Sequence, residues 1–272
     1  MVETGRVRII GWAVLIVALL LTLYPPLWML SASFKTNAEV FSDIGLGLGV
    51  AGLENYTTAF DRRPFGLYLL NSILAAAATV AITLLLAILA GYGFAKFRFR
   101  GQEILWVIVL ASFMVPLEAI VIPLFLQVHA LGLNNSYAGL ILPTGLNAVG
   151  IFILRQAILS VPDDYVEAAR IDGAGEPRIL WSVVVPLVAP SIAVVAILTF
   201  NLTWNSFLWP LVVVSDDSLR TLPIGMALFQ STFNTQYGQV MAVSVIGTLP
   251  TVLMFLFFQR SMLDGAIASG VR

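Results

Sequence analysis

Long stretches without any charged residue constrain this chain more than any other feature of its 272-residue sequence. There are 26 uncharged residues between Arg8 and Lys35, and 32 between Arg63 and Lys96. A helix needs about 20 apolar residues to cross a bilayer, so each such window has room for one crossing. With 59% hydrophobic and 11% charged residues, the chain cannot cover its surface with charge as a soluble domain does. The sequence therefore predicts an all-α integral membrane protein.

Six such windows predict six transmembrane helices within one domain that covers residues 1–272. The predicted spans are 9–32, 68–95, 104–128, 136–155, 185–212 and 239–259. The first window could instead be a secretory signal peptide, because Arg6 and Arg8 precede it. Its apolar run is longer than the roughly 7–15 residues of a signal-peptide core, which favours a membrane anchor that is retained.

Lysine and arginine are distributed unevenly between the two sides that six crossings create. The two termini and the loops after the second and fourth spans carry ten of these residues, whereas the opposite side carries four. In membrane proteins the cytoplasmic loops carry the excess of basic residues. The sequence therefore predicts that the N-terminus, the C-terminus and the loop over residues 160–186 are cytoplasmic.

The composition excludes several classes of function. A net charge of −1 gives no reason to expect a nucleic-acid partner. Because the chain has no cysteine and a single histidine, His129, disulfides and Cys/His metal sites are excluded, and no metal or other cofactor is expected. A P-loop needs a lysine directly after a glycine, but Lys35 and Lys96, the two lysines, follow other residues. We therefore expect a non-catalytic chain whose energy source lies in a separate subunit.

The 160–186 loop has the sequence pattern of two short helices. Ser160 and Pro162 are typical of a helix start, with Ser160 as the capping residue. Gly173 is expected to end the first helix, because glycine adopts the left-handed stop conformation at little cost. Glu176 and Pro177 then begin the second helix. The loop is predicted to fold as two helices separated at Gly173.

Small and apolar residues of the first of these helices predict a narrow ridge that fits a groove in another protein. They are Tyr165, Val166, Ala168, Ala169 and Ile171. The alternative is an amphipathic linker on the lipid headgroups, but such helices carry lysine and arginine against anionic lipid. Five acidic residues and only two arginines occur between residues 163 and 178, so docking to a protein is favoured.

The 160–186 loop resembles the EAA loop of the permease subunits of bacterial ABC importers. The matching positions are Glu167-Ala168-Ala169, Gly173, Val183, Val185 and Pro186, at the spacing of that motif. In the family this loop is the coupling helix that docks in a cleft of the ATPase subunit, on the type I importer permease fold. The resemblance implies that the ATPase-coupling residues here are Glu167, Ala168, Ala169, Asp172, Gly173 and Pro186.

Further stretches are similar to the smaller permease subunit of maltose-type sugar importers, from about Leu70 to the C-terminus. They include 114–116, 131–137, 139–143, 203–210 and 257–260, and residues 265–272 match the tail of the family in part. The resemblance implies a carbohydrate substrate and the cytoplasmic (inner) membrane of a prokaryote. It also implies four partners: a second, non-identical permease subunit that carries most sugar contacts, two ATP-binding subunits and an extracellular solute-binding protein.

Polar residues inside the predicted spans are candidates for the substrate path. Asn201, Trp204 and Asn205 combine amides with an aromatic ring, which suits the hydroxyls and apolar faces of a sugar. Asn71 is a second candidate, and for all four residues helix–helix hydrogen bonding or an interfacial position is an equally good explanation. Glu118 lies between two prolines; it either accepts hydrogen bonds from substrate or, as we favour, satisfies a broken helix or lines a gate.

The sequence therefore favours a permease subunit of an ATP-driven importer that moves a sugar or oligosaccharide by alternating access. Residues 33–67 and 213–238 are expected to face the solute-binding protein, the latter through Asp216, Asp217, Gln230, Asn234 and Tyr237. An ABC permease for a non-sugar solute, such as a glycerol phosphate diester or an osmolyte, remains an alternative. A phosphorylated solute should recruit arginine into the path. An ion-coupled secondary carrier is the other alternative, although it should place more ionisable groups within the spans.

Overall fold

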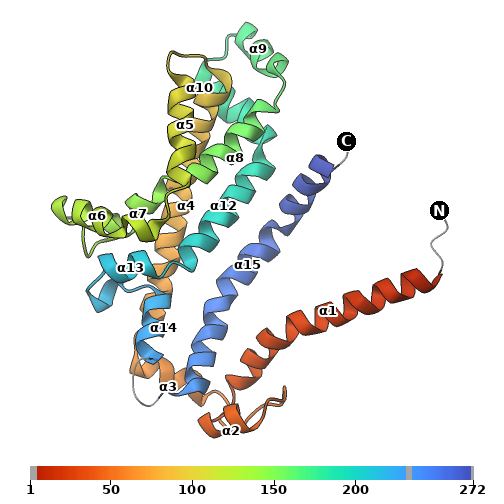
Figure 1. Ribbon diagram of the computed structural model, residues 1–272, viewed down its shortest axis with the longest axis vertical. Coiled ribbons are helices and arrows are strands. Elements are labelled where there is room, and N and C mark those ends of the chain that lie inside the picture. The colour runs from red at the N-terminus through yellow and green to blue at the C-terminus, as the bar shows by residue number, and fades with distance from the viewer. Residues whose placement is uncertain (1–4, 231–234, 271–272) are drawn as a thin grey trace. The chain divides into compact units, whose positions relative to one another are not determined.

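The computed structural model describes residues 5–230 and 235–270, with side chains from residue 8 to 228 and from 235 to 259. All regular secondary structure in these ranges is helical, which confirms the all-α class (Figure 1). The predictions for Gln230, Asn234 and the tail 265–272 concern side chains outside these ranges. The elements are α1 (Gly5–Ala32), α2 (Asn37–Ser42), α3 (Glu54–Arg62), α4 (Phe65–Lys96), α5 (Gln102–Phe113), α6 (Leu117–Ala130), α7 (Tyr137–Gly145), α8 (Ala148–Leu159), α9 (Asp163–Ile171), α10 (Glu176–Ile179), η1 (Leu180–Val184), α11 (Val185–Leu187), α12 (Ala189–Trp204), α13 (Leu208–Val213), η2 (Asp217–Leu219), α14 (Leu222–Gln230) and α15 (Tyr237–Gly270).

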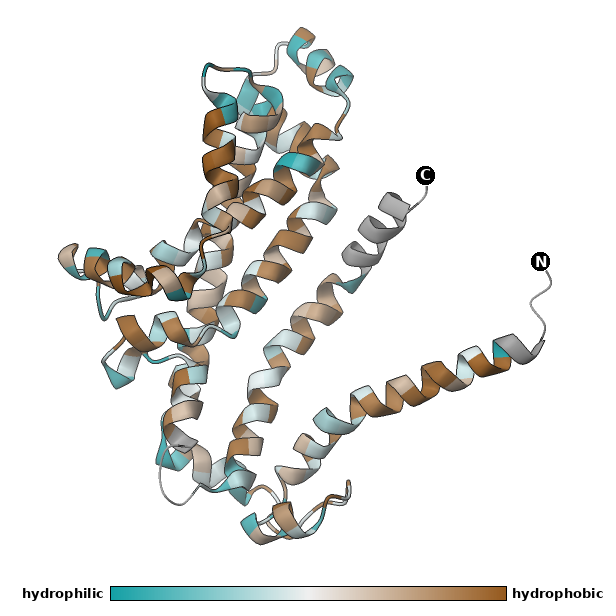
Figure 2. Ribbon diagram, in the orientation of Figure 1, coloured by the Kyte–Doolittle hydropathy of each residue, from teal (hydrophilic) through white to brown (hydrophobic). Residues whose placement is uncertain are grey.

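Three of the described helices are each long and apolar enough to cross a membrane alone. They are α1, α4 and α15, which cover the predicted spans 9–32, 68–95 and 239–259. Figure 2 shows the hydrophobic residues that follow one another along α1. α1 continues through Pro25 and Pro26, and α15 through Pro250, as spanning helices tolerate when the freed backbone groups find other partners.

Each of the other three predicted spans is a broken helix, and for 104–128 the two prolines that flank Glu118 predict such a break. Within 104–128, α5 and α6 meet at an angle of 104°. Pro116 stands directly before α6. Proline lacks a backbone N–H and drives the preceding residue out of the helical conformation, which explains the break.

The remaining two windows are bent for local reasons of the same kind. Within 136–155, α7 and α8 meet at 44°, with Pro143 in the last turns of α7. The window 185–212 contains a bend of 81° between Leu187 and Ala189 and is interrupted again between Trp204 and Leu208. The described helices amount to six crossings if each bent pair crosses once, and the number of six remains a prediction.

The chain divides into two compact units, and the first comprises residues 1–66 and 225–249. Hydrogen bonds tie distant parts of this unit together. The Asn55 amide donates to the carbonyls of Ser33 and Lys35 at 2.9 and 2.8 Å, and the Tyr237 N–H donates to Asn37 Oδ1 at 2.8 Å. Residues 33–66 are therefore a folded structure at the end of α1 and not an open loop.

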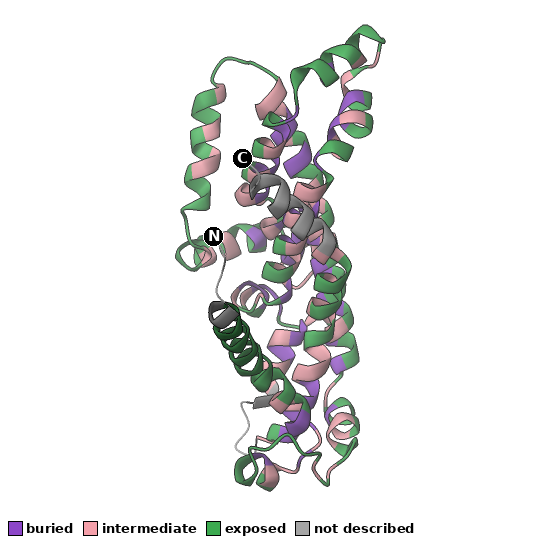
Figure 3. Cartoon of the chain, turned by 90° about the vertical axis from the view of Figure 1, so that its right-hand side faces the viewer, coloured by how far each residue is buried: buried purple, intermediate pink, exposed green. Residues whose placement is uncertain are grey.

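The second unit comprises residues 67–224 and 250–272. Its main hydrophobic core joins α4, α8, α9, η1 and α12, and a smaller one surrounds Trp209. Figure 3 shows how the buried residues alternate with exposed ones along these helices. Large apolar side chains such as Leu89, Ile104 and Val107 are exposed in this unit, which is what a lipid-facing surface requires.

Candidate functional site

The helix α9 forms the centre of the 160–186 loop, but it starts differently from the prediction. Its first flanking residue is Pro162, and no side chain caps the helix. The Ser160 hydroxyl donates instead to the carbonyl of Ala157 in the preceding helix, at 2.7 Å. The predicted serine cap is therefore wrong. Asp163 and Asp164 in the first turn compensate for the missing cap, because carboxylates there favour the positive end of the helix dipole.

The end of α9 is a Schellman motif built on Gly173. Gly173 has a φ of +80°, a conformation that glycine adopts without the cost of a side chain. Its N–H donates to the carbonyl of Arg170 at 3.0 Å, and the N–H of Ala174 reaches back to the carbonyl of Ala169 at 2.9 Å. The prediction that the helix ends at Gly173 is confirmed.

One face of α9 is buried, which narrows the predicted apolar ridge. Val166 is buried in the core of the second unit, and Ala169 packs partly against the same core. The outward face exposes Tyr165, Ala168 and Ile171. The prediction that Val166 belongs to the ridge is wrong, because this valine is buried in the main hydrophobic core. Glu167 lies next to this ridge, is exposed, and makes no hydrogen bond or ion pair within the described part of the chain.

Polar contacts hold the start of α9 to the last turn of α4. The Lys96 ammonium group donates to Asp163 Oδ1 at 2.6 Å and to the carbonyl of Val161 at 2.8 Å. The lysine side chain is almost fully covered, whereas Asp163 is exposed. The hydrogen bond and charge of Lys96 hold the pKa of Asp163 below its usual value. The carboxylate is therefore ionised at neutral pH, and this contact is lost only as the pH falls through that lowered pKa.

A second set of contacts holds the end of α9. Glu176 accepts a hydrogen bond from the Tyr92 hydroxyl of α4 at 2.6 Å and another from Arg170 Nε at 2.8 Å. Its carboxylate thus joins the last turn of α9 to α4. Lys96 therefore joins the start of α9 to α4, and Tyr92 joins its last turn to α4 through Glu176.

The loop joins α12 through an irregular turn that contains Pro186. In η1 the N–H of Val185 bonds to the carbonyl of Leu180, five residues earlier, which is a π-helical turn. Proline at position 186 supplies no N–H to continue the helical ladder. The chain bends by 81° before α12 begins. Pro186 therefore marks the joint between the loop and α12.

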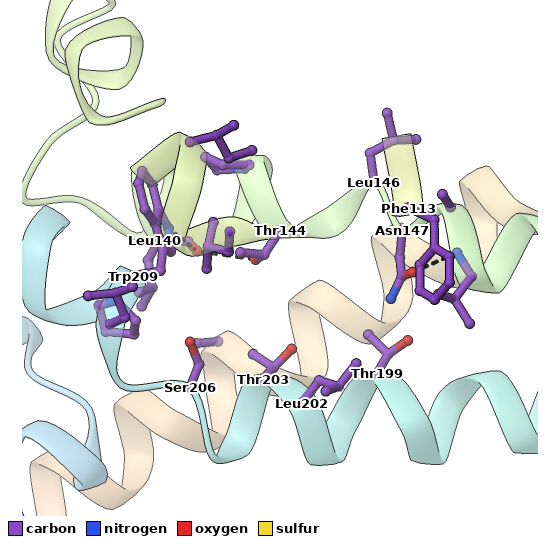
Figure 4. A pocket seen from close by; sticks show the side chains of 18 of the residues that line it. Phe113, Leu140, Thr144, Leu146, Asn147, Thr199, Leu202, Thr203, Ser206 and Trp209 are labelled. Carbon is purple, nitrogen blue, oxygen red and sulfur yellow. Dashed lines mark hydrogen bonds between the residues drawn. The ribbon is translucent and has the colours of Figure 1, made fainter. Parts of the chain in front are cut away.

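A cavity of about 750 Å³ lies in the second unit, between α5, α7, α8 and the end of α12. Figure 4 shows Thr199, Thr203 and Ser206 on one side and Thr144 and Asn147 on the other. The polar lining residues are Ser72, Ser112, Glu118, Thr144, Asn147, Thr199, Thr203, Ser206 and Thr221. Phe113, Phe207 and Trp209 are the aromatic lining residues, and among the described side chains no lysine or arginine lines the cavity.

The cavity lining includes a threonine whose buried hydroxyl has no hydrogen-bond partner within the described residues. Thr221 is 5% exposed, and its Oγ1 is buried without a hydrogen-bond partner among the described residues. An unpaired buried hydroxyl costs free energy. A cavity with many hydroxyls, three aromatic rings and one carboxylate suits an uncharged polyhydroxylated molecule.

Residues 83–263 match the family described as "Binding-protein-dependent transport system inner membrane component". The chain belongs to this family.

Several relatives of this chain are named as permeases, and the similarity covers most of the length of each. The chain is 36% identical to the arabinooligosaccharides transport system permease protein AraQ of Bacillus subtilis, over 93% of this chain and 92% of the relative. It is 33% identical to the lactose transport system permease protein LacG of Rhizobium radiobacter, over 96% and 95%. It is 36% identical to the sn-glycerol-3-phosphate transport system permease protein UgpE of Yersinia pestis, over 80% and 77%.

The fold of the inner membrane component is also found in solved structures. A chain of a bacterial ABC transporter involved in the import of the acidic polysaccharide alginate matches with a TM-score of 0.84. The match covers 96% of this chain and 99% of that chain at 24% identity. The helical architecture described above is therefore the importer permease fold.

Of the five residues predicted for the substrate path, only one lines the cavity. Glu118 lines the cavity, whereas Asn71, Asn201, Trp204 and Asn205 do not. Asn71 is fully buried; its amide donates to the carbonyls of Ser218 and Arg220 at 2.8 and 2.9 Å. Its Oδ1 accepts from the Tyr137 hydroxyl at 2.6 Å. Asn71 thus holds the segment after α13, and three of its four hydrogen-bonding positions are used within the chain.

The polar residues at the end of α12 lie on two different faces. Asn205 donates to the carbonyl and to Oδ1 of Asn201 at 2.9 and 3.1 Å, and both side chains are exposed. Trp204 is buried, and its ring stacks on Phe200. Their contact with substrate stays a prediction. The cavity face carries the hydroxyls of Thr199 and Thr203 instead, whose spacing of four residues places them on one side of α12. The hydroxyl of Ser206, just beyond the end of α12, lines the same cavity.

Proposed function

We propose that this chain is one half of a heteromeric permease in an ATP-driven importer of neutral sugars or oligosaccharides. As one transmembrane domain over residues 1–272, it crosses the inner membrane of a prokaryote six times, with both termini and the 160–186 loop in the cytoplasm. The observation that carries this proposal is α9: a short helix that is joined to α4 at both ends and presents Glu167, Ala168 and Ile171 outward. A surface of this kind supports docking of a separate ATPase subunit.

The contacts of α9 suggest how the ATPase would drive the permease. Closure of two ATPase subunits displaces α9, and the anchors at Lys96 and Tyr92 transmit that displacement to α4 as a rigid-body movement. The 81° bend after Pro186 lets α12 change its direction relative to the loop. Because α4 and α12 contribute residues to the cavity, their movement opens and closes it by alternating access.

The chemistry of the cavity and the relatives supports a carbohydrate as the transported substrate. Two relatives described above are named for arabinooligosaccharides and lactose. A third is named for sn-glycerol-3-phosphate, but a phosphorylated solute calls for arginine or lysine, and among the described side chains neither lines this cavity. The alternative of a phosphorylated solute is therefore not favoured.

The assembly that we propose contains this chain, a second and non-identical permease subunit, two ATP-binding subunits and an external solute-binding protein. A related fold has been solved as the bacterial alginate ABC transporter in complex with a periplasmic protein. By analogy, residues 33–67 and 213–238 face that partner. Within the second of these segments, Asp217 accepts a hydrogen bond from the Tyr68 hydroxyl and pairs with Arg220, which leaves Asp216 as the more available carboxylate.

Purification of the complex from native membranes tests the proposed function. A tagged chain should bring a P-loop ATPase and a second permease with it. In proteoliposomes, the complex should hydrolyse ATP faster when the solute-binding protein and its sugar are added outside. Purification of this chain alone, with uptake that depends on an ion gradient and not on ATP, would show that it is a secondary carrier.

Removing one cavity hydroxyl should weaken sugar transport without unfolding the permease. Thr203 faces the cavity and makes no hydrogen bond within the described part of the chain. Thr203→Val keeps the shape of the side chain and removes the hydroxyl, which should cost about 1 kcal/mol of substrate binding and raise the KM for transport about fivefold. Thr248→Val is the matched control, because the Thr248 hydroxyl bonds to its own helix at Ser244. Equal KM values for the two variants would remove Thr203 from the path.

A further inference from the structure

Residues 43–50 form a short hairpin that runs back along α1. Its first half starts beside Lys35, whose ammonium donates to Asp43 and to the carbonyl of Gly45. The hairpin then reaches Tyr24, whose hydroxyl donates to the carbonyl of Ile44 at 2.8 Å. It returns past Ser31, which donates to the carbonyl of Gly47 at 2.6 Å. Figure 1 shows this segment between α2 and α3, beside the end of α1.

The position of Tyr24 places the tip of the hairpin at membrane depth. The apolar run of α1 begins after Arg8, and about 30 Å of helix, or about 20 residues, are needed to cross the hydrocarbon. That length extends to about residue 28, beyond Tyr24. Tyr24 lies seven residues, or about 10 Å, before Ser31 along the helix. The carbonyl of Ile44 is therefore held below the outer end of the crossing.

The side chains of the hairpin are apolar and uncovered. Ile44, Leu46, Leu48 and Val50 are 72%, 49%, 79% and 84% exposed. Residues 45, 47 and 49, between them, are glycines. A side chain on Gly49 would collide with the backbone of Phe34 and Lys35, since its Cβ would lie 2.7 and 2.5 Å from their atoms. The hairpin is therefore packed directly on the end of α1, with its apolar side chains turned outward.

Part of the backbone of the hairpin is bonded by protein groups, namely the carbonyls that face α1 and the N–H of Gly45. Irregular backbone survives at membrane depth only where protein groups bond its polar atoms. The side chains of Tyr24 and Ser31 in α1, and of Lys35 three residues beyond it, bond the carbonyls of residues 43, 44, 45 and 47. Lys35 is 1% exposed, and its three donated hydrogen bonds all go to residues 43 and 45. Its charge is thus compensated by Asp43 at the base of the hairpin.

We propose that the 43–50 hairpin inserts into the outer leaflet of the bilayer, with Ile44, Leu46 and Leu48 among the lipid chains. The inference rests on the proposed crossing of the membrane by α1, whose C-terminal end is then at the outer surface. The hairpin anchors the folded residues 33–66 to the membrane surface and fixes their height above it. Lipid is the occupant that matches both the depth of the segment along α1 and its fully apolar outward face.

Site-directed spin labelling tests this proposal in the intact transporter, because the native chain has no cysteine. Single variants Leu46→Cys and Leu48→Cys carry a nitroxide in lipid nanodiscs that contain the whole complex. Collision of the nitroxide with oxygen reports contact with lipid, and collision with a water-soluble nickel chelate reports contact with water. We expect oxygen to dominate at both positions, and the Leu46 label to lie deeper than the Leu48 label.

Two control positions distinguish an error in the proposed insertion of the hairpin from an error in the proposed membrane crossing by α1. Val14→Cys on α1 should report lipid, and Asp61→Cys on the exposed side of α3 should report water. If Val14 reports lipid while Leu46 and Leu48 report nickel, the hairpin is in water and the proposal is wrong. If neither reagent reaches Leu46 and Leu48, a partner protein covers the hairpin, which also overturns it. A nickel-accessible Val14 would instead contradict the proposed crossing by α1.

Discussion

Glu167→Lys should abolish transport while the permease stays folded and inserted in the membrane. Glu167 is exposed on α9 and has no hydrogen bond or ion pair within the described chain, so reversing its charge removes no internal contact. Reversing one partner of a charge contact that is buried between subunits costs about 2–5 kcal/mol. The affinity for the ATPase subunit should therefore fall about 30-fold or more. Transport into proteoliposomes and recovery of the ATPase on a tagged permease measure both effects.

The matched control for this variant is Glu103→Lys. Glu103 is exposed in the first turn of α5, on the same side of the membrane in the proposed topology, and makes no hydrogen bond or ion pair with α9 within the described residues. The two variants change the net charge equally, so a general effect of charge on membrane insertion would appear in both. Wild-type transport by Glu167→Lys, or equal losses in the two variants, would show that α9 is not the point of coupling.

The uninterrupted spans were predictable because length and apolarity alone define them. α1, α4 and α15 follow the charge-free windows closely. The break beside Glu118 was predictable from its two flanking prolines, but the angle of the bend was not, because a proline within an apolar window is also compatible with an uninterrupted helix, as Pro25 in α1 demonstrates. How far the chain turns at Pro116 depends on the packing of α6 against α13, which is a tertiary contact.

In the coupling loop, the end of α9 at Gly173 was predictable from the sequence, whereas the residues that α9 buries and exposes were not. Gly173 signals the stop because no other residue adopts its backbone conformation cheaply. Val166 and Ile171 are both apolar, however, and the sequence does not say which of them meets the core. The buried position of Val166 follows from its place in the main hydrophobic core, whose residues only the folded chain brings together.

The residues that line the cavity were predictable only in part, because the prediction rested on amides and tryptophan, whereas most of the polar lining residues carry hydroxyls. Thr199 and Thr203 lie on one face of α12, and that spacing was available in the sequence. Thr221 and Asn147 come from other elements and join the cavity through tertiary structure alone. A helix face with hydroxyls four residues apart is therefore a better guide to the lining of this cavity than the isolated amides of Asn201 and Asn205.

Gly173→Pro should destroy the coupling loop itself, and its effect should differ in kind from that of Glu167→Lys. Proline cannot adopt a φ of +80°, and it removes the N–H that donates to the carbonyl of Arg170. The bond from Ala174 to Ala169 depends on the same turn. A cost of about 3 kcal/mol or more should unfold the end of α9 and separate Arg170 from Glu176. Transport should be lost, and protease added to the cytoplasmic side should cleave the loop faster.

Gly173→Asn distinguishes the backbone conformation from the mere absence of a side chain. No other part of the described chain lies within 4 Å of a Cβ placed at Gly173, and asparagine tolerates the left-handed conformation better than other residues with a side chain. The asparagine variant should therefore keep most of the transport activity and the wild-type rate of cleavage. Equal loss in both variants would mean that a partner packs against Gly173 itself. Normal transport by Gly173→Pro would mean that the turn after α9 does not carry the coupling movement.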